Sequence, residues 1–248
     1  MPSNAPEIKI VADVAQLNRT AADEFLTAAQ SSIRARGRFC VALAGGSTPR
    51  GVYSLLAEDQ SNPEKRLPWE KVFVFFGDER HVPPDDAESN YRMARESLLS
   101  KVPIPQQNVF RIAGELDANI AAAQYEQKLL NFFQIGPEEW PRFDLIMLGM
   151  GPDGHTASLF PDSPALQENH RKVVANWVEK FQSYRLTFTL PLLNHAAEVM
   201  FLVSGESKAE VLKDVLGSAK KAIYPCQRVR PENGRLLWIV DRAAAKLL

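Results

Sequence analysis

Four short apolar runs, each followed directly by a loop of glycine and polar residues, most constrain what this chain can fold into. They cover residues 39–44, 72–76, 144–148 and 198–203, the last two led by one acidic residue. Continuous apolar runs of this length are typical of strands buried on both faces of a parallel sheet. Between them apolar residues recur at helical spacing, as in residues 13–36. This alternation predicts an α/β fold, with a three-layer, mainly parallel, doubly wound sheet and helices on both faces.

The rest of the chain shows no internal repeat, low-complexity segment or clear linker, so we expect one α/β domain over residues 1–248. Alternating apolar and polar residues at 173–178 and 185–190 indicate strands of an antiparallel excursion. Asp13 is placed to cap the first helix, and Ser47 or Thr48 to cap the second ahead of Pro49. Further expectations are strands at 8–11, 109–112 (an edge strand) and 236–240, helices at 91–99 and 117–133, a helical turn at 156–160 and a basic helix after 240.

Composition excludes several classes of partner. Lys and Arg number 29 against 30 Asp and Glu, and a net charge of −1 gives no reason to expect nucleic acid or a membrane surface as partner. No apolar run is long enough to span a bilayer, and residues 1–10 lack the pattern of a signal peptide. Two cysteines, Cys40 and Cys226, fit a reducing cytoplasm better than a disulfide framework. We therefore expect a cytoplasmic protein with a small-molecule ligand.

The loops after the four apolar runs carry residues that turns alone do not need. If the four strands are parallel, all four loops lie at the carboxyl edge of one sheet, where ligands of open α/β sheets bind. Arg80, His155 and Lys208 are not turn formers, so a purely structural explanation of all four loops is weak. This inference gathers into one cleft the candidates Ser47, Thr48, Asp78, Arg80, Asp153, His155 and Lys208.

The chemistry of this set is that of a phosphate pocket joined to an acid/base site. Glycines 45 and 46 let backbone N–H groups approach an anion at a helix N-terminus, and Ser47, Thr48 and a cation from Lys208 or Arg80 can complete the cradle. An imidazole titrates near neutral pH, so His155 can take a proton from water. Either Asp153 or Asp78 could hold its ring in the useful tautomer.

Three well-defined cofactor, metal and nucleophile motifs are not supported by the sequence. Gly149, Gly151 and Gly154 match the dinucleotide fingerprint, but Pro161 stops the following helix too soon for one. The four histidines, at 81, 155, 170 and 195, have no metal-ligand spacing, so no metal is expected. No G-x-S-x-G elbow supports a serine acyl-enzyme.

Five blocks resemble the 6-phosphogluconolactonase family within the larger glucosamine-6-phosphate isomerase/6-phosphogluconolactonase superfamily. They are LAGGSTP (43–49), FFGDERHVPPDDAESNYRMARESLL (75–99), GMGPDGHTASLFPDSPAL (149–166), RLTFTLPLLNHA (185–196) and SGESKAEVL (204–212). The sister deaminases carry MDEY where GDER stands here, and an asparagine–glutamate–proline segment in the third block. The lactonase side is therefore favoured, and the resemblance implies a modified Rossmann-like fold.

The resemblance implies an enzyme that hydrolyses 6-phospho-D-glucono-1,5-lactone to 6-phosphogluconate in the oxidative pentose phosphate pathway, without metal or cofactor. It implies His155 as general base, with Asp153 as its orienter, and Arg80 at the phosphate or the oxyanion. Lys208, Gly45, Gly46, Ser47 and Thr48 resemble the phosphate-binding set, and Arg185 is a weaker candidate for it. A monomer or weak homodimer is expected. An amino-sugar-phosphate deaminase and a non-catalytic sugar-phosphate sensor remain open.

Overall fold

The computed structural model describes residues 5–63, 65–217 and 224–248 of the chain. Strands and helices alternate through most of its length, and short 3₁₀ turns join them. The strands are β1 (Glu7–Val11), β2 (Phe39–Leu43), β3 (Val72–Phe76), β4 (Asp78–Arg80), β5 (Leu145–Gly149), β6 (Val173–Val178), β7 (Ser183–Phe188), β8 (Glu198–Val203) and β9 (Arg235–Asp241). The helices are α1 (Val14–Arg36), α2 (Ser47–Glu58), α3 (Asn90–Ala94, continued by a π turn over Arg95–Leu99), α4 (Ala118–Phe133), α5 (Leu190–Asn194) and α6 (Ala209–Leu216).

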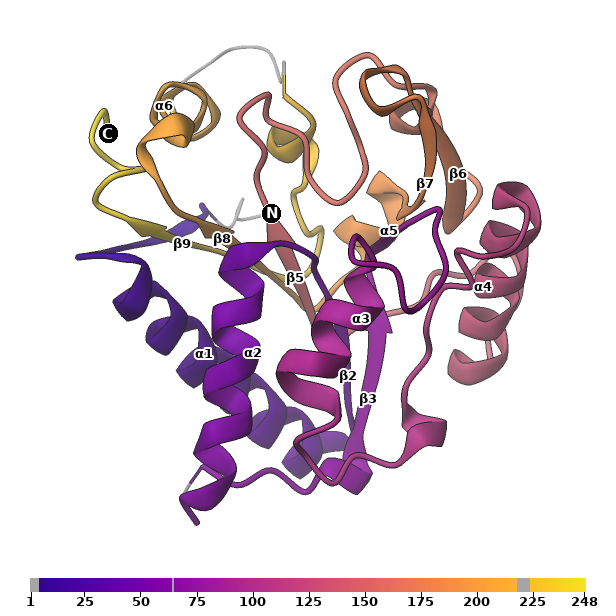
Figure 1. Cartoon of the computed structure of the whole chain (residues 1–248), viewed down its shortest axis with the longest axis horizontal. Helices are drawn as coiled ribbons and strands as arrows, with labels where there is room; N and C mark the ends of the chain where they lie inside the picture. The colour runs from indigo at the N-terminus through magenta and orange to yellow at the C-terminus, as the bar shows by residue number, and fades with distance from the viewer. Residues whose placement is uncertain (1–4, 64, 218–223) are drawn as a thin grey trace.

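Six strands form one parallel sheet in the order β1-β9-β8-β5-β2-β3 (Figure 1). Strands β4, β7 and β6 form a second, antiparallel sheet, which is the predicted excursion. The four apolar runs became β2, β3, β5 and β8, which pair parallel with one another. Their carboxyl ends therefore lie at one edge of the large sheet.

Helices pack against both faces of the large sheet. Phe25 of α1 meets Phe39 of β2 edge-on, with ring centroids 5.3 Å apart. Phe75 of β3 is the register partner of Ala42, so it points to the face opposite Phe39. There Phe75 meets Phe132 of α4 at 5.1 Å. The predicted doubly wound α/β fold is thus confirmed.

Several local expectations were wrong, because longer-range contacts overrode local pattern. Residues 78–80 form β4 rather than a loop, since they pair with β7. Residues 109–112 make only one bridge, between Val109 and Val74. The expected turn of helix at 156–160 is a tight reversal, because Ala157 has φ 46° and Thr156 pairs with Leu159. The cap of α2 is Gly46, and residues 242–247 form turns instead of a basic helix.

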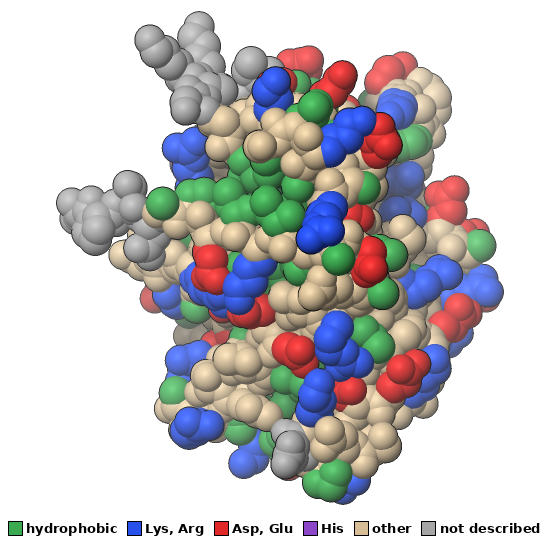
Figure 2. Space-filling view, turned by 90° about the vertical axis from the view of Figure 1, so that its left-hand side faces the viewer, with side chains coloured by type: hydrophobic (Ala, Val, Ile, Leu, Met, Phe, Trp, Pro, Cys, Tyr) green, Lys and Arg blue, Asp and Glu red, His purple; other side chains and the backbone are tan. Residues whose placement is uncertain are grey.

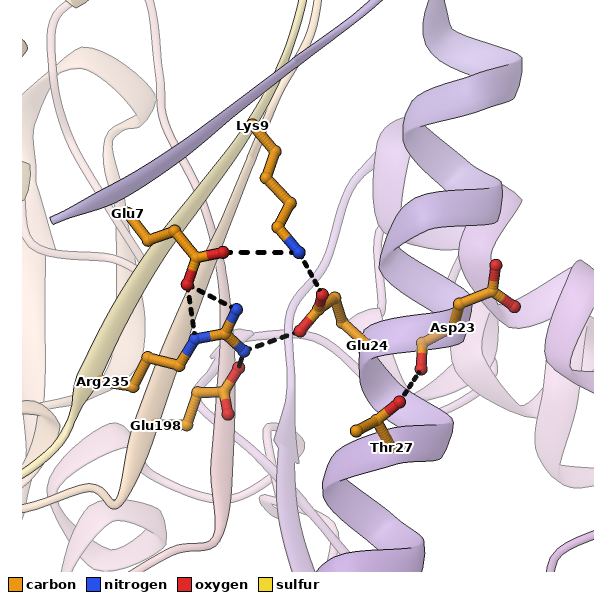
Figure 3. A network of polar contacts seen from close by, with 7 residues as sticks. All are labelled: Glu7, Lys9, Asp23, Glu24, Thr27, Glu198 and Arg235. Atoms are coloured by element: carbon orange, nitrogen blue, oxygen red, sulfur yellow. Dashed lines mark hydrogen bonds and ion pairs between the residues drawn. The ribbon is translucent and has the colours of Figure 1, made fainter.

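Strand β1 is the edge of the large sheet. Figure 2 shows this side of the molecule, where apolar side chains gather in one patch above interspersed acidic and basic ones. On the α1 face of this edge, Arg235 donates hydrogen bonds to Glu7, Glu24 and Glu198, and Lys9 donates to Glu24 (Figure 3). This network joins β1, β8 and β9 to α1.

We expect Arg235→Met to lower the free energy of unfolding in urea by about 1–2 kcal/mol, between the values typical of exposed and buried ion pairs. The loss arises because Glu24 and Glu198, which are mostly buried, lose the guanidinium that they share. Hydrogen bonds from Arg235 lower the pKa of Glu7, and those from Arg235 and Lys9 outweigh the burial that would raise the pKa of Glu24. The network therefore stabilises the folded state at pH values above 4.5, the ordinary pKa of glutamate. This contribution is lost as the pH falls through the lowered pKa values of Glu7 and Glu24.

The matched control is Arg171→Met, which removes a single, half-exposed ion pair with Glu126. Its unfolding free energy should change by less than about 1 kcal/mol. Equal losses in the two variants, or a loss at Arg235 that does not shrink in acid, would contradict a cooperative network.

Candidate active site

A cavity of about 290 Å³ opens at the carboxyl edge of the large sheet. The loops after β2, β3, β5 and β8 all contribute to its wall, as the parallel arrangement predicts. Eight of the ten candidates from the sequence line it: Gly45, Gly46, Ser47, Thr48, Asp78, Arg80, His155 and Lys208. The other two, Asp153 and Arg185, lie behind this wall, where they contact lining residues or their neighbours.

The loop after β5 holds His155 through its own backbone. Gly151 N–H donates to the carbonyl of His155 at 2.9 Å, and Gly154 N–H donates to the carbonyl of Gly151 at 3.0 Å. This closed turn places the Asp153 carboxylate beside the imidazole, with Oδ1 2.5 Å from Nδ1. The backbone N–H of His155 donates to the same oxygen at 3.3 Å. Local geometry therefore places the carboxylate beside Nδ1 of the ring.

The charge on Asp153 decides the tautomer of this pair. Burial raises the pKa of this carboxyl, but the hydrogen bonds and charge of His155 outweigh it, and the pKa lies below the ordinary value of 3.8. An ionised carboxylate only accepts, so the neutral ring carries its proton on Nδ1 and presents the Nε2 lone pair. In the part of the chain that the structure describes, no hydrogen bond to Nε2 occurs. The ring thus has a nitrogen lone pair available at the cavity that it lines.

Two glycines of this loop are required by close packing. A Cβ on Gly151 would lie 2.0 Å from Nδ1 of His155 and 2.7 Å from Oδ1 of Asp153. Gly154 has φ 74°, and a Cβ there would lie 2.5 Å from the ring of Tyr224. The segment after residue 223 supports the loop as well, because Cys226 N–H donates to the carbonyl of Gly154 at 3.1 Å. The sequence signal that could reveal this packing is the glycine spacing itself.

The loops after β2 and β8 form the opposite wall. Helix α2 begins at Ser47 with Gly46 as its N-cap at φ 105°, and no side chain accepts from its first turn. The hydroxyls of Thr48 and Ser204 lie 2.9 Å apart and join the two loops. Asp241 accepts from the N–H of Gly205 and so holds the loop that carries Lys208. Free amides at a helix N-terminus next to a cation form an anion-binding wall.

Lys208 carries the charge of this wall. Burial lowers the pKa of its ammonium, the charge of Asp153 raises it, and that of Lys180 lowers it again, with a net lowering. Lys208 lines the same cavity as His155. A half-buried ammonium gains more from a bound anion than one in open water does.

The third wall is built by β4 and the start of α3. Asp78 accepts from Ser158 Oγ at 2.7 Å and from Asn90 Nδ2 at 3.3 Å, and it makes no contact with the imidazole. Of the two carboxylates that the sequence left open as orienter, only Asp153 is hydrogen-bonded to the ring. Asn90 also packs so close to Gly45 that a Cβ there would lie 1.9 Å from its Oδ1.

Glu79 fixes the backbone of this wall. It is buried, and its carboxylate accepts from Ser89 Oγ and from the backbone N–H groups of Asn90, Tyr91 and Arg80. Burial raises the pKa of Glu79, with these backbone hydrogen bonds opposing it. The result is a rigid base for Arg80, whose guanidinium donates to the carbonyl of Glu88 at 2.8 Å.

Arg185 of β7 pairs with Arg80 of β4 across the small sheet. Its side chain is only 10% exposed, and its ion pair with Glu88 is 3.9 Å long. Burial lowers the pKa of this guanidinium, and the neighbouring Arg80 lowers it further. Within the described ranges no hydrogen bond satisfies its guanidinium. A nearly buried cation without a close anion is costly unless a ligand supplies one.

The other histidines lie in structural positions. His195 Nδ1 lies 2.8 Å from the carbonyl of Pro191 and its ring stacks on Trp140, His170 is exposed, and His81 Nε2 lies 2.7 Å from the carbonyl of Leu116. Among residues 5–63, 65–217 and 224–248, no group of three or more His, Cys, Asp or Glu could hold a metal ion. No helix in those ranges is long and apolar enough to cross a membrane.

Sequence reasoning missed three residues of the site. Asn90 lies fourteen positions after Phe76, the last residue of β3, in a segment with no local signal. Ser158 and Phe160 were expected in a helical turn. Their partners Asp78 and His155 are known only once the two sheets are in place. Tertiary contacts, rather than local pattern, position them.

Comparison with known proteins agrees with this geometry. A family model described as glucosamine-6-phosphate isomerases/6-phosphogluconolactonase matches residues 12–238. The chain is 41% identical over 240 residues to 6-phosphogluconolactonase of Nostoc sp., covering 96% of each chain. It is 44% identical over 222 residues to 6-phosphogluconolactonase of Homo sapiens, covering 86% of this chain and 82% of the human one.

A solved structure extends the likeness to the fold. The structure of 6-phosphogluconolactonase from Trypanosoma cruzi matches with a TM-score of 0.87 at 32% identity, covering 100% of this chain and 98% of that one. The resemblance first drawn from the sequence blocks is confirmed. The chain belongs to the glucosamine-6-phosphate isomerase/6-phosphogluconolactonase family.

Proposed function

We propose that this chain hydrolyses 6-phospho-D-glucono-1,5-lactone to 6-phospho-D-gluconate, with His155 as general base. The single observation that carries the proposal is the Asp153–His155 pair, 2.5 Å between Oδ1 and Nδ1, beside a cavity that Lys208 also lines. A base and a cation in one small cavity suit a substrate with an activated carbonyl at one end and a phosphate at the other. The family names of the relatives support the same substrate.

In this mechanism Nε2 of His155 takes a proton from water as the oxygen attacks the lactone carbonyl. Asp153 keeps the ring in the right tautomer and stabilises the imidazolium that forms. The imidazolium then returns the proton to the ring oxygen as the C–O bond breaks. A lactone ester is already activated, so a positioned base that contributes about 10²- to 10⁴-fold and an oxyanion partner with a similar factor suffice.

The phosphate end is proposed to lie against Lys208 and the start of α2. The uncapped amides after Gly46 and the hydroxyls of Ser47 and Thr48 supply neutral donors. Arg185 is proposed to supply further positive charge near the phosphate, since its buried guanidinium lacks a close carboxylate. Phosphate binding far from the carbonyl supplies the energy that orients the reacting end.

Arg80 and Asp78 are proposed to act around the reacting end. Arg80 lines the cavity on a rigid backbone and can stabilise the oxyanion. Asp78 lines the same cavity and is hydrogen-bonded to Ser158, so it is suited to accept from a sugar hydroxyl. A monomer or weak homodimer is proposed, and the two free thiols fit the cytoplasm.

The decisive experiment is an assay with freshly generated lactone, coupled to a 6-phosphogluconate dehydrogenase and corrected for spontaneous opening. We expect rate acceleration on the lactone and no release of ammonia from glucosamine 6-phosphate. Ammonia release would instead identify a deaminase. Binding of 6-phosphogluconate without acceleration of lactone opening would identify a sensor.

Lys208→Ala should raise KM about 10- to 100-fold while kcat stays within about threefold, since a charge-assisted hydrogen bond to the distant phosphate is lost. Initial rates over a range of lactone concentrations give both constants. The control is Lys213→Ala, an exposed lysine in the last turn of α6 that does not line the cavity. A KM that stays unchanged in Lys208→Ala would remove this residue from the phosphate end.

A further inference from the structure

Two aromatic side chains connect the catalytic imidazole to the β6–β7 hairpin. The ring of Phe160 stacks on His155, with centroids 4.4 Å apart and planes inclined by 26°. Phe181 then meets Phe160 edge-on at 5.8 Å and 73°. Phe160 is buried, whereas Phe181 is 45% exposed and lies in the turn Glu179–Phe181 at the hairpin tip.

The same hairpin tip reaches the proposed phosphate end. The guanidinium of Arg185 lies over the ring of Phe181, 5.1 Å from its centroid. Lys180, next to Phe181, lies 3.9 Å from the outer oxygen of Asp153, but its side chain is 63% exposed and the pair is long. An exposed ion pair of this length contributes little. The aromatic contacts are therefore the stronger connection.

The imidazole needs this support because a single hydrogen bond does not fix a plane. The bond from Nδ1 to Asp153 sets the position of one ring nitrogen, but the ring can still tilt about that contact. Gly151 lies close to one edge of the ring, and Phe160 is stacked on a face. Together these three contacts determine where Nε2 points, and catalysis by a general base depends on that direction.

We propose that Phe160 is a positioning residue for His155 and that Phe181 holds Phe160 in place while it covers the Arg185 guanidinium. The hairpin tip thereby links phosphate recognition to the orientation of the base. This inference rests on the proposed function and adds to it two residues from outside the cavity wall.

The test compares Phe160→Leu, Phe160→Tyr and Phe181→Leu with the control Trp177→Leu. Trp177 is an exposed aromatic of the same hairpin, but it packs edge-on against Tyr184 instead of Phe160. We expect Phe160→Leu to lower kcat about tenfold with little change in KM, and Phe160→Tyr to keep kcat within about threefold. Phe181→Leu should lower kcat less and raise KM, since it also uncovers Arg185. Trp177→Leu should change neither constant by more than about twofold.

Recovery in Phe160→Tyr separates positioning from simple loss of folded enzyme. The charged groups around the ring are Asp153 from its own loop, Lys208, Lys180, and Asp78 and Arg80 across the cavity. None of them changes in Phe160→Leu, so a lowered kcat that Phe160→Tyr restores is due to the stacked ring. Partial unfolding would instead lower kcat in proportion to the folded fraction, which melting curves measure.

An unchanged kcat in Phe160→Leu and Phe181→Leu would overturn the proposal, and so would a lowered kcat in Phe160→Leu with no recovery in Phe160→Tyr. Failure of the proposed function is distinguishable, because in that case the unaltered chain itself would not accelerate lactone opening. Melting temperatures of all four variants show that the comparison is between folded proteins.

Discussion

His155→Asn should lower kcat for lactone hydrolysis by about three orders of magnitude, within the 10²- to 10⁴-fold range of a positioned general base. Asparagine fills similar space and its amide can still donate to Asp153, so the loop should keep its shape. It offers no basic nitrogen to water, so the loss should appear in kcat. Initial rates with fresh lactone, corrected for spontaneous opening, measure the effect.

Binding should survive this change, because the phosphate end lies on other loops. Calorimetric titration with 6-phosphogluconate should give a Kd within about threefold of the unaltered chain. The control is His195→Asn, since that imidazole contacts the carbonyl of Pro191 and the ring of Trp140 away from the cavity. Turnover near the normal rate in His155→Asn would show that another group activates water.

Much of the site could be predicted because it depends on strand order along one edge. The runs that became β2, β3, β5 and β8 are apolar apart from one leading acidic residue in each of the last two, which indicated strands buried on both faces. Parallel strands bring their following loops to one edge, so the meeting of Ser47, Arg80, His155 and Lys208 around one cavity followed from topology alone.

The remainder depended on contacts between the two sheets. The loop pattern left both Asp78 and Asp153 open as orienter, because each follows a buried strand, and only the family resemblance favoured Asp153, which is the one hydrogen-bonded to Nδ1. Strand β4 exists because β7 pairs with it, and three residues after a glycine show no strand pattern by themselves. Phe160 was expected in a turn of helix, and its stacking on His155 required the left-handed backbone of Ala157.

Gly151→Ala should lower kcat about 100-fold or more while the fold remains. The added Cβ would lie 2.0 Å from Nδ1 of His155 and 2.7 Å from Oδ1 of Asp153, so the ring and the carboxylate cannot both keep their places. The φ of Gly151 is not in the left-handed region, and the backbone itself can accept alanine. The effect therefore falls on the base, and a displacement of about 1 Å in a catalytic group can cost 10²-fold in rate.

The matched control is Gly77→Ala, at the end of β3 on the same edge of the sheet. Its Cβ would meet only the Leu43 carbonyl at 3.8 Å and a Phe188 ring carbon at 4.0 Å, which are ordinary contacts, and Gly77 does not line the cavity. We expect this variant to keep kcat within about threefold. That result would show that replacing a glycine at this edge of the sheet does not by itself lower kcat. A kcat of Gly151→Ala equal to that of Gly77→Ala would contradict this prediction. It would mean that the imidazole tolerates displacement and that the close fit of Gly151, Asp153 and His155 does not determine the rate.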